Sequence, residues 1–147
     1  MATQTKDRIT CHVLDTKLGK PAKGIRVKLE LSSPPSTAQH HGVTPASRTF
    51  ESQTDDDGRI KAWLPYSSPT SSGEVPVYTL EDVLDEVDSG GAETSRWTLR
   101  FDTGAYFGEE NTFFPEVAVV FTVKKGEAHY HVPVLLSPYS YTTYRGS

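Results

Sequence analysis

The sequence of 147 residues is poor in several features that define large classes of protein. It has one cysteine, Cys11, which excludes an internal disulfide and a metal site built from several cysteines. We expect Cys11 to be a small buried residue. The net charge of −4 argues against non-specific nucleic-acid binding, which requires clustered lysine and arginine. Since no apolar run approaches the length of a membrane span, we expect neither a nucleic-acid nor a membrane partner.

The N-terminal segment lacks a secretory signal, because residues 1–8 contain no apolar core. We therefore expect a cytoplasmic protein. The chain has the length of one domain, and 35% of its residues are apolar, which allows a buried core. We predict a single domain over residues 1–147.

Alternation of apolar and polar residues predicts a chain made mainly of β-strands. The pattern is clearest over residues 25–31, where four apolar residues alternate with three charged ones, as in a strand with one buried face. The other predicted strands cover residues 9–15, 49–54, 59–64, 96–101, 117–123, 129–136 and 139–144. About eight strands joined by short turns are typical of an all-β fold, a two-sheet antiparallel β-sandwich.

Two helical segments are predicted between the strands. Apolar residues recur at helical spacing from Leu80 to Val87, and Thr79 lies three residues before Asp82, as in a capping box. A brief helix is also expected over residues 102–108. The first helix would then be a small helical insertion packed on the surface of the domain.

Two stretches differ in composition from the strands and are treated as insertions, about residues 32–48 and 66–95. The first contains His40 and His41, which we interpret as a solvated pair because no further ligands lie at metal-site spacing. The sequence Asp-Asp-Asp-Gly at residues 55–58 predicts a tight turn, since the later acidic ligands of a calcium loop are absent. We therefore predict no metal and no cofactor.

Four places offer side chains suited to chemistry. His12 and His131 are predicted in mid-strand, on faces turned away from the core, and apolar neighbours suggest that another subunit covers them. Arg59 directly follows the turn, so its guanidinium can reach over a sheet edge. The chain closes with Tyr-Arg-Gly-Ser at residues 144–147, a possible wall of a site. Taken singly, each of these residues is more often structural or solvated, so the pattern alone leaves the function open.

Several blocks of sequence resemble the 5-hydroxyisourate hydrolases, which are close relatives of transthyretin. The blocks are Ile-Thr-Cys-His-Val-Leu-Asp at 9–15, Gly-Lys-Pro-Ala at 19–22, Phe-Asp-Thr-Gly-Ala-Tyr-Phe at 101–107, Phe-Phe-Pro-Glu-Val at 113–117, His-Tyr-His-Val-Pro at 129–133, Leu-Leu-Ser-Pro-Tyr-Ser-Tyr at 135–141 and Tyr-Arg-Gly-Ser at 144–147. The last block is the most specific, because the hormone-carrying transthyretins lack it.

The resemblance implies a transthyretin-type β-sandwich that assembles as a homotetramer, a dimer of dimers, with active sites at the dimer–dimer interface. It implies hydrolysis of 5-hydroxyisourate to 2-oxo-4-hydroxy-4-carboxy-5-ureidoimidazoline during urate breakdown, without metal or cofactor. The catalytic residues it implies are His12, Arg59 and His131, and the substrate-binding residues are Tyr144, Arg145, Gly146 and Ser147. His131 is chosen over His129 because it precedes Val-Pro, as in the family motif.

In this hypothesis His12 or His131 is the general base, and Arg59 stabilises the developing oxyanion. The alternative function is a transthyretin-type carrier that holds a small ligand without catalysis. A third interpretation is an adhesion or carbohydrate-binding module. For a eukaryotic urate pathway the peroxisome is the alternative to the cytoplasm.

Overall fold

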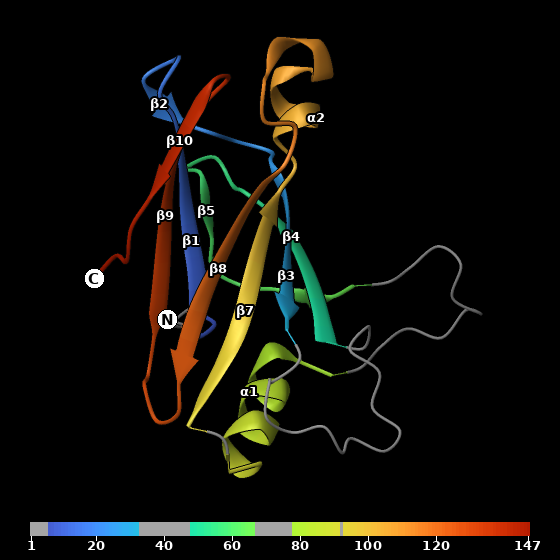
Figure 1. Ribbon diagram of the computed structural model, residues 1–147, viewed down its shortest axis with the longest axis vertical. Helices are drawn as coiled ribbons and strands as arrows, with labels where there is room; N and C mark the ends of the chain where they lie inside the picture. The colour runs from blue at the N-terminus through green and yellow to red at the C-terminus, as the bar shows by residue number, and fades with distance from the viewer. Residues whose placement is uncertain (1–5, 33–47, 67–77, 92) are drawn as a thin grey trace, which may run out of the picture.

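The computed structural model describes residues 6–32, 48–66, 78–91 and 93–147, and it consists of two β-sheets packed face to face (Figure 1). The first sheet has the order β10-β9-β1-β2, with β5 also paired to β1, and the second has the order β6-β4-β3-β7-β8. The strands are β1 (Ile9–Asp15), β2 (Lys20–Pro21), β3 (Arg26–Leu31), β4 (Thr49–Gln53), β5 (Arg59–Ile60), β6 (Leu64–Pro65), β7 (Thr94–Phe101), β8 (Val117–Lys124), β9 (Tyr130–Ser137) and β10 (Ser140–Thr143). The predicted all-β sandwich is confirmed. The pair His40 and His41 lies outside the described residues. So do residues 33–47 of the first predicted insertion and residues 67–77 and 92 of the second.

The core lies between the sheets and is formed by the inward residues of the alternating strands. Phe50, Trp97 and Leu99 are fully buried there, and each contributes roughly 2–3 kcal/mol through the apolar surface it removes from water. Cys11 is free and fully buried, as expected, and burial raises the pKa of its thiol. Among the described helices, none is long and apolar enough to cross a membrane.

One strand pair departs from the predicted antiparallel arrangement, because β1 and β9 run parallel with Thr10 opposite His131. The other paired strands are antiparallel. Local alternation cannot distinguish the two arrangements, since residues alternate between faces in both. The chain crosses from β8 in the second sheet to β9 in the first, so the direction of β9 is set by this crossover rather than by a hairpin with β1.

The predicted strand over residues 59–64 is in fact two short strands in different sheets. β5 pairs with β1, whereas β6 pairs with β4. Trp63 lies at the crossing, and its indole Nε1 donates a hydrogen bond of 2.8 Å to the carbonyl of Ile9. The turn at residues 55–58 therefore joins the two sheets. Its glycine, Gly58, has φ +75°, and a Cβ there would lie 2.3 Å from the carbonyl oxygen of Val13.

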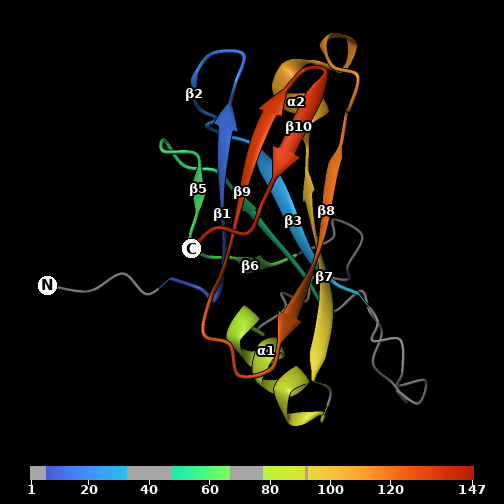
Figure 2. The ribbon, with the colours of Figure 1, turned by 60° about the vertical axis from the view of Figure 1, so that its left-hand side comes forward.

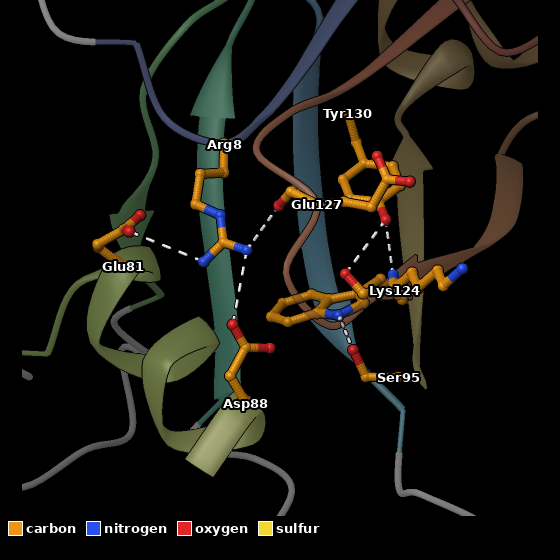
Figure 3. Close-up of polar contacts among 8 residues, drawn as sticks. Arg8, Glu81, Asp88, Ser95, Lys124, Glu127 and Tyr130 are labelled. Carbon is orange, nitrogen blue, oxygen red and sulfur yellow. Dashed lines mark hydrogen bonds and ion pairs between the residues drawn. The ribbon is translucent and has the colours of Figure 1, made fainter. Parts of the chain in front are cut away.

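The helices cover opposite ends of the sandwich (Figures 1 and 2). α1 (Leu80–Ser89) begins at Thr79 with the predicted capping box and buries Leu80, Val83 and Leu84. Arg8 ties α1 to the sheets, because its guanidinium lies 3.8 Å from Glu81 and 3.7 Å from Asp88 and donates to the carbonyl of Glu127 (Figure 3).

At the other end, α2 (Thr103–Phe107) confirms the short helix predicted over residues 102–108, and η2 (Glu109–Asn111) follows it. Asp102 caps α2 by accepting a hydrogen bond from the backbone N–H of Ala105. The hydroxyl of Tyr106 donates to Asp15 at 2.7 Å, and burial, aided by this bond, raises the pKa of Tyr106 to about 12. The bond fixes α2 against the end of β1.

Candidate active site

Three strands of the first sheet bring the predicted catalytic residues together on its outer face. His12 lies on β1 opposite Arg59 on β5, and His131 lies on β9. The ring centroids of His12 and His131 are 6.5 Å apart. Residues separated by 47 and 72 positions thus meet because the sheet places β1 between β5 and β9. The alternation along β1 also explains the direction of His12, since its neighbours Cys11 and Val13 point into the core.

A pocket of about 120 Å³ opens on this face. Its lining residues are Lys6, Thr10, Cys11, Arg59, Ile60, Lys61, His129, His131 and Ser147. Apart from the buried thiol, the titratable side chains in this lining are all basic. The pocket is therefore suited to an anion or to an oxygen that gains negative charge during a reaction. Among the described residues, no three His, Cys, Asp or Glu side chains are grouped as metal ligands would be.

His12 is held in a defined tautomer. Its Nε2 lies 2.9 Å from the carbonyl oxygen of Asp57, in the turn before β5. Because a carbonyl only accepts hydrogen bonds, Nε2 must carry the hydrogen. In the neutral ring Nδ1 then keeps its lone pair, and this nitrogen is the one that can exchange a proton with a ligand.

His131 occupies a different electrostatic environment. The pKa of His131 is lowered, chiefly by partial burial and then by the nearby charge of Arg59, with smaller contributions from His129, His12 and Lys6. Its Nδ1 lies 2.8 Å from the hydroxyl oxygen of Thr10. A histidine whose pKa lies below the usual value is neutral at pH 7, so His131 is present there in the form that accepts a proton.

The C-terminal segment packs directly against His131, and in Figure 2 it returns from β10 across β9. The backbone N–H of Gly146 donates a hydrogen bond of 2.9 Å to the carbonyl of His131. A Cβ at position 146 would lie 2.7 Å from Cδ2 of His131 and 3.0 Å from Cγ of Pro133. Glycine is therefore required for this close approach, which brings Ser147 into the pocket lining.

Tyr144 and Arg145 lie in an adjoining pocket of about 270 Å³ between β8, β9 and β10. The guanidinium of Arg145 is 4.9 Å from the centre of the Tyr130 ring and 3.5 Å from the carboxylate of Glu127. His131 lines both pockets. The structure thus gathers Arg59, His131 and Ser147 in one pocket. Gly146 contacts His131, and the His12 ring lies beside it, with centroids 6.5 Å apart. Tyr144 and Arg145 line the adjoining pocket.

The model of the HIUase/Transthyretin family matches residues 9–146. This chain belongs to that family. Membership agrees with the fold and accounts for the resemblance of the sequence blocks from the first strand to the C-terminal segment.

Relatives within the family cover most of the chain. A probable 5-hydroxyisourate hydrolase of Schizosaccharomyces pombe is 34% identical over 142 residues, which are 95% of this chain and 90% of that protein. The 5-hydroxyisourate hydrolase of Mus musculus is 35% identical over 149 residues and the full length of both chains. The solved structure of Klebsiella pneumoniae 5-hydroxyisourate hydrolase superposes with a TM-score of 0.57 and 25% identity, covering 96% of this chain and 100% of that one.

Three polar residues of the pocket, Lys6, Thr10 and Lys61, were missed by the sequence reasoning, and His129 was considered there but set aside in favour of His131. The period of two along a strand contains a signal for two of them. Thr10 precedes His12 by two residues, and His129 precedes His131 by two, so each shares a face with a predicted catalytic residue. The two lysines carry no such signal, because an exposed lysine near a strand end is a common solvated residue.

Proposed function

We propose that this chain hydrolyses 5-hydroxyisourate to 2-oxo-4-hydroxy-4-carboxy-5-ureidoimidazoline in urate degradation. The observation that carries the proposal is the convergence of three side chains from three strands on one sheet face. Arg59 and His131 line the basic pocket, and His12 lies beside them. Support comes from the relatives, which are about a third identical over almost the whole chain and are named as hydrolases of this compound. The carrier alternative has less support, because a carrier has no need of a histidine pair beside an arginine.

The proposed reaction opens the six-membered ring of the substrate by addition of water. His131 takes a proton from the water, because its lowered pKa keeps it neutral near pH 7. The oxygen of the attacked carbonyl becomes negative, and the guanidinium of Arg59 stabilises it. His12 enters this step with both ring nitrogens protonated and gives its Nδ1 proton to the departing ring nitrogen, while its Nε2–H stays on the Asp57 carbonyl. It regains the Nδ1 proton from solvent before the next turnover. No metal or cofactor takes part in these steps.

The terminal residues complete the proposed site in two ways. Gly146 fixes the backbone of His131, and Ser147 lines the pocket where the substrate binds. Tyr144 and Arg145 line the adjoining pocket, and we propose that they hold the part of the substrate that extends past His131.

We further propose that the protein is a homotetramer, a dimer of dimers, with the sites at the dimer–dimer interface. The site lies on an outer sheet face beside Leu14 and Leu135, which are only partly buried in the single chain. A pocket of about 120 Å³ is also smaller than the roughly 300–1,000 Å³ of typical ligand sites. A second copy facing this surface would enclose it. The mass in solution tests the assembly, and a folded monomer that is fully active would contradict it.

The direct test of the function is a coupled assay. Urate oxidase converts urate to unstable 5-hydroxyisourate, and its absorbance decay is followed with and without the protein. We expect faster decay with the wild type, loss of that acceleration in Arg59→Ala, and full acceleration in the control Arg26→Ala on the other sheet. Decay at the spontaneous rate with folded wild type would overturn the proposal. Location in the cytoplasm, or alternatively the peroxisome, remains a separate proposal that cell fractionation tests.

A further inference from the structure

The hydroxyl of Thr10 lies between two histidines. Its oxygen is 2.8 Å from Nδ1 of His131 and 3.3 Å from Nε2 of His129. The two imidazole rings are nearly parallel, with an angle of 12° and centroids 6.4 Å apart. Thr10 is only 4% exposed, whereas His129 lies on the surface. The three side chains therefore form a continuous line from the half-buried His131 to solvent.

The register of β1 with β9 places these three side chains next to one another. β1 and β9 run parallel, and Thr10 is the direct partner of His131. His129 lies two residues before His131, so both rings point to the same side of the chain. A further acceptor, the carbonyl of Tyr130, lies 3.5 Å from the Thr10 hydroxyl, which is too long to compete with the two imidazoles.

A hydroxyl donates one hydrogen bond and can accept others, so the Thr10 hydroxyl accepts from one histidine and donates to the other. In one arrangement Nδ1–H of neutral His131 donates to the Thr10 oxygen, and the Thr10 hydroxyl donates to Nε2 of His129. The second nitrogen of His131, Nε2, is then the unprotonated one and is available to a reacting water.

We propose that Thr10 and His129 form a proton relay that carries the proton taken up by His131 out to solvent. When Nε2 of His131 takes a proton from water, its Nδ1 proton passes to the Thr10 oxygen, and the Thr10 hydroxyl proton passes to Nε2 of His129. His129 then releases its Nδ1 proton to solvent. Every group ends neutral, with one proton moved. This inference rests on the proposed hydrolysis and assigns two further residues to it.

The charges around His131 favour such an exit. Partial burial and the positive charges of Arg59 and Lys6 disfavour a proton that stays on the His131 ring. The proposed product carries a carboxyl group, which is ionised at pH 7, so each turnover leaves one excess proton. Moving that proton to the exposed His129 separates it from Arg59. Thr10 and His129 act through His131, so they are positioning residues and not catalytic ones.

The kinetic test compares Thr10→Val, Thr10→Ser and His129→Gln with the control Thr16→Val. Thr16, directly after β1, also carries a hydroxyl, but that hydroxyl donates to the carbonyl of Leu136 at the far end of the β1–β9 pair. We expect Thr10→Val and His129→Gln to lower kcat about tenfold with little change in KM, which is less than the roughly 10²–10⁴-fold effect of losing a general base. Thr10→Ser and the control should keep nearly the full rate, and added imidazole should restore His129→Gln.

Full activity in His129→Gln would overturn the relay, even if Thr10→Val were slow, because Thr10 would then only orient His131. If Thr10→Val fails to fold, His129→Gln and its imidazole rescue decide the question, since His129 is exposed. A slow His129→Gln that imidazole fails to rescue would also contradict proton transfer.

A second measurement separates the relay from the reaction itself. NMR titration of the imidazoles in the wild type, without substrate, should show that the titrations of His129 and His131 are coupled. Thr10→Val should weaken this coupling to the part that charge alone transmits. Independent titration in the wild type would refute the hydrogen-bonded line, whatever the activity. Coupled titration together with decay of 5-hydroxyisourate at the spontaneous rate would instead overturn the proposed function, and with it a catalytic use of the relay.

Discussion

The outer faces of the two sheets are built on the same alternation but differ in how their charges are paired. On the β3–β7 face, Arg100 lies 2.9 Å from Glu30 and 3.0 Å from Glu116, so its charge is matched by neighbours. On the β1–β9 face, His12 and His131 lie beside Arg59. Among the residues that the structure describes, no acidic side chain lines the pocket of Arg59 and His131. Paired ions in solvent have little capacity for further chemistry, whereas unmatched basic groups can bind and exchange protons.

The two faces also differ in the size of their pockets, and the larger pocket is not the one with the catalytic candidates. The hollow over the β3–β4 face measures about 900 Å³, and the pocket at the histidines only about 120 Å³. The larger one is lined mainly by solvated charges of both signs, such as Lys28 and Glu51. The smaller one contains the group with the lowered histidine pKa. Local chemistry therefore locates the site better than volume.

The largest expected effect comes from removing a histidine on the β1–β9 face. His131→Ala should lower kcat/KM by roughly 10²–10⁴-fold, because the proposed general base is lost. Lys28→Ala on the opposite face is the control and should leave the rate unchanged. Both are measured in the 5-hydroxyisourate decay assay at equal concentrations of folded protein. A rate within a few fold of wild type for His131→Ala would refute its role.

A smaller effect is expected from the backbone that supports His131. Gly146→Ala places a methyl group 2.7 Å from the His131 ring, so the ring or the terminal segment must shift. We expect kcat/KM to fall about tenfold to 100-fold with little loss of stability. Gly90→Ala is the control, since its Cβ would meet nothing closer than 3.4 Å. Equal activity of the two variants would show that the close packing at position 146 is dispensable.

A substitution on the β3–β7 face should change the stability of the protein and not its activity. Arg100→Met removes both ion pairs of that side chain, which is 39% exposed. Because such pairs are screened by solvent, we expect the free energy of unfolding to fall by no more than about 1 kcal/mol, with kcat/KM unchanged. Denaturant unfolding and the decay assay together check this. A fall in activity would mean that the two faces are coupled.

The smallest effect concerns pH. Because the pKa of His131 lies below the usual value for histidine, kcat/KM should fall only when the pH drops below that ordinary range. Lys6→Gln removes a positive charge near His131, so the pKa of His131 should rise and the acidic limb of the profile should move to higher pH by a few tenths of a unit, roughly. Lys125→Gln, in the turn after β8, is the control. A shift to lower pH would contradict the assigned electrostatics.

The sequence predicted those parts of the fold that depend on local pattern. β1, β3 and α1 follow from alternation, helical spacing and the capping box, because each is decided by neighbouring residues. The division of residues 59–64 between two sheets was missed, since the burial of Trp63 at the crossing depends on the packing of distant strands. The parallel direction of β9 was missed for the same reason.

The candidate site was predicted through resemblance more than through pattern. Alternation placed His12 and His131 on an outer face, but it did not show that they lie together. That proximity follows from the register of β1 with β9, a long-range property. Thr10 escaped notice, and His129 was set aside in favour of His131, because the position of both beside His131 depends on the same register.

The most direct test of the difference between the two faces uses two double variants in the 5-hydroxyisourate decay assay. His12→Ala/His131→Ala changes the β1–β9 face, and Lys28→Ala/Arg100→Met changes the other one. We expect decay near the spontaneous rate with the first variant and acceleration equal to wild type with the second, when both are folded. Acceleration retained by the histidine double variant, or lost in both, would contradict the claim that catalysis resides on the β1–β9 face.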